Sequence, residues 1–310
     1  MNTSLYDTIA QSPAARSMAE ASLAGNAALV ERELDTLYRA GGRCDGALDA
    51  SCRYSLMAGG KRVRPTLTLE FCRLFGGEDR AALPFAMAIE MVHTFSLIHD
   101  DLPCMDDDEL RRGRPTNHRM FGEATALLAG DGMALDAFGV AAGNSYVPPA
   151  TRAGAVRLLS AAAGCAGMVR GQVMDMFGET HALTLEELKD LHAHKTGALI
   201  RAAAQMGVLA AGKGEDSPEM AAAVGYAERI GLAFQIVDDV LDATSTAEKM
   251  GKSVGGDAGH HKNTFLSFFP VDEAMAEAVR LSAEAAELIH PYPGSDCLCA
   301  LAVYLAERKK

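Results

Sequence analysis

The feature that most restricts the fold of this chain is an apolar segment that runs directly into a block of acids. Residues 86–98 (AMAIEMVHTFSLI) place hydrophobic side chains at helical spacing, and six carboxylates follow between Asp100 and Glu109. A run of acids is usually a solvated face or a flexible loop, but here Asp100 and Asp101 directly continue an apolar helix. Because these like charges repel one another, the fold has to supply positive charge beside them.

The residues after this helix predict a turn. Pro103 disfavours the α-helical conformation at Leu102, so we expect the chain to bring Asp106 back beside Asp100 and Asp101. Converging carboxylates suit a hard divalent cation such as Mg²⁺, which keeps open positions for phosphate oxygens. The arginines that follow suit polyphosphate, because guanidinium groups bind it in a bidentate manner. They are Arg111, Arg112 and Arg114.

A second acidic motif lies in the sequence GLAFQIVDDVLDA. On a helical wheel its polar side chains fall within about a third of the circumference, while the other faces are apolar. A helix that is apolar nearly all round is buried, so its polar stripe has to face partners. These partners are either a structural network of ion pairs or a metal-filled pocket shared with the first motif. The stripe consists of Gln235, Asp238, Asp239 and Asp242.

Basic and polar motifs accompany the acids. Two glycines precede Lys61, Arg62 and Arg64, and flexible backbone of this kind can approach a phosphate closely. Each isolated lysine elsewhere could bind phosphate or could simply be a solvated surface residue. The further candidates are Lys195 and Thr196, Lys252 and Lys262, and the set Gly171, Gln172 and Asp175.

Composition predicts an all-α protein. Helix-forming residues dominate, strand-type alternation is hard to find, and no long linker interrupts the chain, so we expect one domain over residues 1–310. In residues 183–207, Thr184 and Glu187 form a capping box and Gly207 is the expected helix stop.

The same composition excludes several classes of protein. A net charge of −12 argues against nucleic-acid binding. No stretch reaches the ~18 uninterrupted apolar residues of a membrane-spanning helix, and the first residues lack the pattern of a signal peptide. The seven cysteines have no disulfide-framework spacing, which is typical of reduced thiols in the cytoplasm.

Taken together, the motifs make the chain similar to the trans-isoprenyl diphosphate synthases, and closest to the bacterial farnesyl and geranylgeranyl diphosphate synthases. Six motifs occur in the family's order over nearly the whole chain: GGKRxRP, DDxxxxD followed by RRG, GQxxD, KTG, DDxxD and paired lysines. One departure is the pair His260-His261 before Lys262, with Gly-Gly before Asp257. The resemblance implies a helical bundle around a central metal and diphosphate cavity, and a homodimer.

The resemblance also implies roles for individual residues. Metal ligands would be Asp100, Asp101, Asp106, Asp238, Asp239 and Asp242. Isopentenyl diphosphate would be bound by Lys61, Arg64, His93 and Arg112. The allylic diphosphate would be bound by Arg111, Lys195, Thr196, Gln235, Lys252 and Lys262, with Lys195 and Lys252 also taking part in catalysis. The cofactor would be Mg²⁺, about three ions per active site, with Mn²⁺ as a substitute.

The implied reaction is the head-to-tail condensation of isopentenyl diphosphate with dimethylallyl or geranyl diphosphate. An aromatic residue five positions before the first motif, Phe95, with the small Ser96 beside it, resembles farnesyl synthases, so we expect farnesyl diphosphate as main product and geranylgeranyl diphosphate as the alternative. On the helical wheel Phe95 lies about 140° from Asp100, so it is alternatively an ordinary core residue.

Three rival functions remain to be compared with this one. A terpene cyclase would share the fold, but its second metal motif mixes Asn, Ser or Thr with Glu. A phosphohydrolase using His99-Asp100 would need further distributed histidines. A non-catalytic subunit would be expected to lack one acidic motif, whereas both are intact here.

Overall fold

The fold is all-α, as the sequence predicts. The computed structural model describes residues 4–39, 46–244 and 263–308. The long helices are α2 (Pro13–Leu37), α3 (Ala47–Leu56), α4 (Val63–Leu74), α5 (Asp79–Asp100), α7 (Glu123–Ala142), α8 (Pro149–Ala163), α9 (Met168–Gly178), α11 (Ala198–Ala210), α12 (Pro218–Thr244), α14 (Val271–Ile289) and α15 (Asp296–Glu307). Shorter elements are α1 (Leu5–Ala10), α6 (Asn117–Phe121), α10 (Leu185–His192), η1 (Ala193–Gly197), η2 (Phe265–Ser267) and the strands β1 (Leu110–Arg111) and β2 (Arg114–Pro115).

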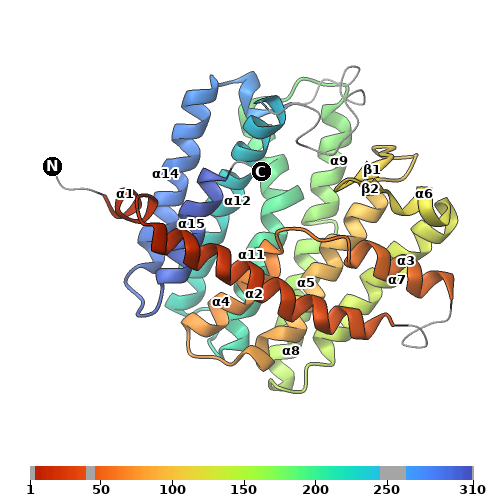
Figure 1. The fold of residues 1–310 in the computed structure, drawn as a ribbon, viewed down its shortest axis with the longest axis horizontal. Coiled ribbons are helices and arrows are strands. Elements are labelled where there is room, and N and C mark those ends of the chain that lie inside the picture. Colours follow the sequence, from red (N-terminus) through yellow and green to blue (C-terminus); the bar gives the residue numbers. More distant parts are fainter. Residues whose placement is uncertain (1–3, 40–45, 245–262, 309–310) are drawn as a thin grey trace.

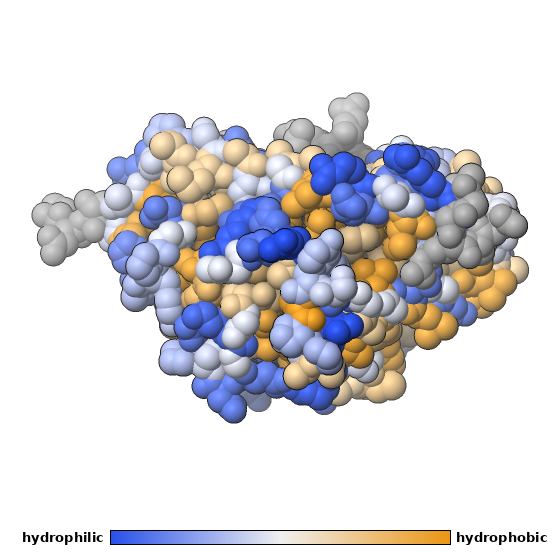
Figure 2. All heavy atoms as spheres, turned by 90° about the horizontal axis from the view of Figure 1, so that it is seen from below, coloured by the Kyte–Doolittle hydropathy of each residue, from blue (hydrophilic) through white to orange (hydrophobic). Residues whose placement is uncertain are grey.

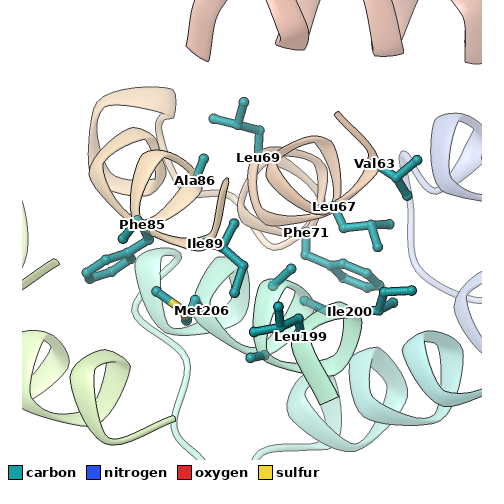
Figure 3. Close-up of a cluster of buried hydrophobic side chains, with 14 of the residues drawn as sticks. Val63, Leu67, Leu69, Phe71, Phe85, Ala86, Ile89, Leu199, Ile200 and Met206 are labelled. Carbon is teal, nitrogen blue, oxygen red and sulfur yellow. The ribbon is translucent and has the colours of Figure 1, made fainter. Parts of the chain in front are cut away.

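The centre of the bundle is formed by α4, α5 and α11, which contact one another (Figure 1). On one side α12 packs against α14 and α15, and on the other α5 packs against α7, with α3 and α6 outside it. Figure 3 shows the side chains that fill the centre, among them Phe71 of α4, Ile89 of α5 and Met206 of α11, all fully buried. In Figure 1 the last residues of α5 and α12, which carry the two acidic motifs, point toward the same upper end of the bundle.

Gly207 does not end a helix, contrary to the prediction. Helix α11 continues to Ala210. A Cβ atom at Gly207 would lie 2.4 Å from the carbonyl oxygen of Thr68 in α4. This glycine therefore permits close contact between two central helices, a tertiary reason that no local pattern reveals.

The segment predicted as one helix over residues 183–207 is divided in two by a π-helical turn. The capping box is confirmed, because the Thr184 hydroxyl accepts from the backbone of Glu187 while the Glu187 carboxylate accepts from the backbone of Thr184. Between α10 and α11 lies η1, which is π-helical and carries Lys195 and Thr196. π-Helical turns occur frequently at functional sites.

The surface of the bundle is not uniformly polar. By length and composition, α5 and α7 would be able to cross a membrane, and 67% of the apolar window is buried in α5 but only 33% in α7. Helix α5 is thus a core helix, whereas α7 exposes Leu128 and Leu135. Seen from below, hydrophobic side chains are mixed with polar ones across the face, and several gather toward the lower right (Figure 2).

Candidate active site

The first acidic motif folds back on itself as predicted. Helix α5 ends at Asp100, and the backbone N–H of Asp106 donates to the carbonyl oxygen of Asp100 at 2.8 Å. The N–H groups of Met105 and Asp107 donate to the carbonyl oxygen of Leu102 at 2.8 and 3.2 Å. The turn after Leu102 therefore returns Asp106 to the end of α5.

Asp100 lies among charged and polar groups from three elements. The side-chain amide of Gln172 in α9 donates to its Oδ1 atom. Burial raises the pKa of Asp100 to about 7; the positive charge of Lys195 opposes this shift, and the negative charge of Asp106 adds to it. A Cβ atom at Gly171 would lie 2.2 Å from the backbone nitrogen of Lys195, so this glycine lets α9 bring Gln172 next to the π-helical turn.

Asp101 is paired with an arginine. Its carboxylate is buried, and its Oδ1 atom accepts from Nε of Arg111 at 2.6 Å and lies 2.5 Å from Nη2 of the same side chain. Arg111 also contacts Asp108 at 3.4 Å. Strands β1 and β2 form a tight hairpin that holds Arg111 in place, and the left-handed conformation of Arg112 and Gly113 closes its turn. The positive charge that the first motif requires thus comes partly from its own hairpin.

The hairpin connects the first motif to the glycine-lysine loop. The guanidinium of Arg112 donates to the carbonyl oxygen of Gly59. A Cβ atom at Gly60 would lie 2.7 Å from that guanidinium, and Gly60 also has a φ of +127°, so only glycine fits there. A small pocket adjoins Asp101, Arg111 and Arg112, and residues of α3, α5, β2 and the start of α6 also line it.

Arginines of this loop and of the hairpin lie near His93. Burial lowers the pKa of His93 well below its usual value, and the positive charges of Arg64 and Arg112 lower it further. The imidazole is therefore neutral at physiological pH. Next to it, the buried guanidinium of Arg62 donates from Nη1 to Glu90 at 2.5 Å and from Nε to Glu31 at 2.8 Å.

The second acidic motif has two different environments. Oδ1 of Asp238 accepts from Nη2 of Arg308 at 2.5 Å, while Oδ2 of Asp239 accepts from the backbone N–H of Phe265 at 2.8 Å. Burial raises the pKa of Asp239 to about 7 against that hydrogen bond, and the negative charges of Asp238 and Asp242 add to the shift. Asp242, one turn after Asp238, is exposed.

A lysine of the π-helical turn belongs to an ion pair whose charges act on both acidic motifs. The ammonium group of Lys195 pairs with Asp175 of α9. Lys195 lowers the pKa of Asp100, while Asp175 raises the pKa of Asp239. One ion pair thus lies near both acidic motifs, with Lys195 near the first and Asp175 near the second.

Two further residues of the predicted allylic site lie in this region. Thr196 is buried in the π-helical turn, and the side-chain amide of Gln235 lies 3.3 Å from Nδ1 of His192. Lys252 and Lys262, predicted as diphosphate ligands, lie outside the described residues.

The donor set fits Mg²⁺. Among the described residues, no three His, Cys, Asp or Glu side chains are gathered closely enough to hold a metal ion. Nevertheless, burial and like charge raise the pKa values of Asp100 and Asp239 to about 7. A bound cation would stabilise the ionised form of these two carboxylates, and carboxylate oxygens are ligands that Mg²⁺ prefers.

Phe95 and Ser96 occupy different faces of α5. Phe95 packs against the main hydrophobic core, with its ring edge-to-face on His99 at 5.8 Å between centroids. Nε2 of His99 lies 3.1 Å from the carbonyl oxygen of Leu127 in α7, so both rings face α7. Ser96 is buried and donates to the carbonyl oxygen of His93 at 2.9 Å.

Comparison with known proteins decides the family. The sequence model of the family described as Polyprenyl synthetase matches residues 45–288. This chain belongs to the polyprenyl synthetase family. It is 44% identical over 262 residues to the chloroplastic geranylgeranyl pyrophosphate synthase 7 of Arabidopsis thaliana, covering 83% of this chain and 75% of that protein. It is 46% identical over 242 residues to the farnesyl diphosphate synthase of Geobacillus stearothermophilus, covering 77% and 80%.

Solved structures agree with this assignment. An FPP/GFPP synthase from Zymomonas mobilis is 33% identical and superposes with a TM-score of 0.83, covering 93% of this chain and 98% of that one. As a polyprenyl synthetase, the chain is a prenyltransferase that joins isopentenyl and allylic diphosphates. The predicted family and enzyme class are confirmed, while the relatives divide between farnesyl and geranylgeranyl synthases.

Two charged residues of this prenyltransferase site were not singled out from the sequence. Glu90 is buried beside Arg62, and it had a visible signal, since a lone acid in an apolar helix needs a partner. Arg308, the residue after α15, pairs with Asp238, and no feature of its local sequence predicts this contact.

Proposed function

We propose that this prenyltransferase is a Mg²⁺-dependent synthase whose main product is farnesyl diphosphate. The observation that carries the proposal is the ion pair of Lys195 and Asp175 beside the two acidic motifs, where the pKa values of Asp100, near Lys195, and of Asp239, near Asp175, are raised to about 7. Bound Mg²⁺ would neutralise the diphosphate and stabilise it as a leaving group. Asp100, Asp101 and Asp106 would hold ions on one side, and Asp238, Asp239 and Asp242 on the other.

The chain's own cations would orient the two substrates. Arg111, Lys195, Thr196 and Gln235 would bind the allylic diphosphate, as would Lys252 and Lys262. Lys61, Arg64, Arg112 and the neutral His93 would bind isopentenyl diphosphate. When the allylic C–O bond breaks, the electron pair leaves with the diphosphate, and these donors stabilise the charge that develops on it.

Carbon–carbon bond formation then needs little further from the protein. The double bond of isopentenyl diphosphate attacks the allylic carbon, which leaves a new carbocation, and this cation passes a proton to the released diphosphate to give the product. An apolar surrounding has to shield the allylic cation from water. This chemistry uses no serine or cysteine nucleophile.

Farnesyl diphosphate is favoured by the aromatic Phe95 on α5, five residues before Asp100. The alternative product, geranylgeranyl diphosphate, is supported by relatives named for that activity. A phosphohydrolase centred on His99 is disfavoured, because its Nε2 atom lies beside the carbonyl oxygen of Leu127 in α7.

One experiment tests these alternatives together. Pure protein is incubated with Mg²⁺, isopentenyl diphosphate and, in turn, dimethylallyl, geranyl or farnesyl diphosphate, and the products are separated by chromatography. Farnesyl diphosphate as main product supports the proposal, and geranylgeranyl diphosphate supports the alternative. Cyclic hydrocarbons, release of phosphate alone, or no reaction would instead indicate a cyclase, a hydrolase or a non-catalytic subunit. Full activity in excess EDTA would exclude the metal.

We also propose that the protein is a cytoplasmic homodimer of single-domain chains, without a membrane span. The support is the apolar surface on α7 and α9, where Leu128, Leu135 and Val173 are 58, 75 and 63% exposed. A second copy would cover this surface. Light scattering should give about twice the 32.7 kDa mass of one chain, and Leu135→Glu should lower it. A monomeric mass for the unmodified protein, or its flotation with lipid vesicles, would contradict the proposal.

A further inference from the structure

The residue that follows α15 provides a cation to the second acidic motif. Arg308 follows α15 directly, and its side chain is only 2% exposed. Its Nη2 atom donates to the carbonyl oxygen of Phe234 at 2.9 Å and to Oδ1 of Asp238 at 2.5 Å. Its guanidinium carbon lies 3.6 Å from the centroid of the Phe234 ring. Helix α15, which ends at Glu307, packs against α12 (Figure 1).

This guanidinium is buried but only partly satisfied. Within the described part of the chain, Nε and Nη1 of Arg308 are buried without a hydrogen-bond partner. A guanidinium has five N–H donors in a fixed fork, and buried donors without partners are unfavourable. By contrast, buried Arg62 donates from all three of its nitrogens, to Glu31, Glu90 and the carbonyl of Leu56. Arg308 therefore differs from a fully satisfied structural arginine.

The contact also occupies an atom that the proposed metal site needs. Asp238 is the first acid of the second motif, and its Oδ1 atom holds the Arg308 guanidinium. A divalent ion bound to Asp238 would lie close to the positive charge of Arg308, because the guanidinium is hydrogen-bonded to the same carboxylate. The Arg308 side chain is 2% exposed and that of Asp238 is 38% exposed, so water screens the repulsion between the ion and the guanidinium only in part. The ion and Arg308 therefore compete for Asp238.

We propose that Arg308 is the resident cation of the second acidic motif and that a divalent ion has to displace it from Asp238. This inference rests on the proposed metal-dependent function. Metal loading is then coupled to the end of α15, because release of Asp238 frees Arg308 from one of its two acceptors. The pair keeps Asp238 compensated until the metal arrives.

The test is the binding of Mg²⁺ without turnover. The thermal stability of the unmodified protein is titrated with Mg²⁺ in the presence of inorganic diphosphate, and the Mg²⁺ concentration for half-maximal stabilisation is determined. Arg308→Gln removes the charge but keeps a donor for the Phe234 carbonyl. We expect that concentration to fall by about fivefold or more, the usual lower range of such coupling.

Two further variants separate charge from structure. Arg308→Lys keeps the positive charge, so its Mg²⁺ dependence should stay near that of the unmodified protein. Arg157→Gln is the control for net charge, since Arg157 is exposed on α8 and pairs with Glu215; it should change nothing. If Arg308→Lys were shifted as much as Arg308→Gln, charge competition would be refuted.

The outcomes also distinguish this inference from the proposed function. An unmodified protein that Mg²⁺ fails to stabilise would overturn the metal assignment and this inference with it. A normal response that Arg308→Gln leaves unchanged, with only a lower Tm, would overturn this inference alone and make Arg308 a structural tie. A weaker Mg²⁺ response in Arg308→Gln would also overturn it, because Arg308 would then assist the metal.

Discussion

Replacing Glu90 by glutamine should destabilise the protein by about 3 kcal/mol. Glu90 and Arg62 form an ion pair whose side chains are only 2% and 1% exposed. Breaking a buried pair by neutralising one partner costs ~3–5 kcal/mol, because the other charge stays buried without compensation. The lower end applies here, because Arg62 keeps Glu31 and the carbonyl oxygen of Leu56 as acceptors.

The expected change in melting temperature follows from the size of the chain. An unfolding entropy of ~2.1 cal/mol/K per residue over 310 residues gives about 0.65 kcal/mol/K. A loss of about 3 kcal/mol should therefore lower the Tm by about 5 °C in calorimetry or thermal circular dichroism. The matched control is Glu31→Gln; because Glu31 is 34% exposed, this change should cost at most ~1 kcal/mol.

The same substitution should affect one substrate more than the other. Arg62 has a left-handed backbone with a φ of 48° at the start of α4, between Lys61 and Arg64 of the proposed isopentenyl diphosphate site. If the pair with Glu90 holds this conformation, Glu90→Gln should raise the KM for isopentenyl diphosphate more than that for the allylic substrate. A Tm within 1 °C of the unmodified protein, or equal changes in both KM values, would refute the reasoning.

Three other predictions concern the acids and the product. Asp100→Ala and Asp238→Ala should each abolish turnover with helical circular dichroism retained, whereas Glu109→Ala, which removes only an exposed pair with Arg119, should be mild; equal damage would mean that the ligands are misassigned. Phe95→Ala should lengthen the products seen by chromatography; a loss of ~3–5 kcal/mol in stability with unchanged products would make Phe95 a core residue only. The pKa values of Asp100 and Asp239 are raised to about 7, so without metal their contribution to stability should fall as pH rises from about 4 to about 7. The gain in Tm on adding Mg²⁺ should grow over the upper part of this pH range, because fewer protons then compete with the ion for the carboxylates. A gain that shrinks as pH rises would contradict the last prediction.

The sequence predicted those structural features that are determined by residues close together in the chain. Pro103 forced the turn that returns Asp106 to Asp100, and the pair Thr184 and Glu187 marked the start of α10. Gly207 was misinterpreted because its cause is the backbone of Thr68, far away in the sequence. The π-helical turn at Lys195 also escaped prediction, because one extra residue in a turn hardly alters the spacing of apolar side chains.

The sequence could not predict which cation compensates which acid. Arg111 was expected to bind diphosphate, yet it also pairs with Asp101 across the hairpin. Arg308 had no local signal, because its role depends on α15 ending beside α12. Such pairings depend on where helix ends meet in space, which periodicity and motif spacing do not determine.

These pairings divide each acidic motif into two kinds of carboxylate. Asp101 and Asp238 each contact an arginine of the chain. Burial raises the pKa values of Asp101 and Asp238 despite these arginines. Asp100 instead accepts from the amide of Gln172, and Asp239 from the backbone N–H of Phe265, and the pKa values of these two acids are raised to about 7. Neutral donors orient a carboxylate without balancing its charge, so a divalent ion has most to gain at Asp100 and Asp239. We therefore expect metal to bind first at these two acids, one from each motif, and to recruit Asp238 only when Arg308 withdraws.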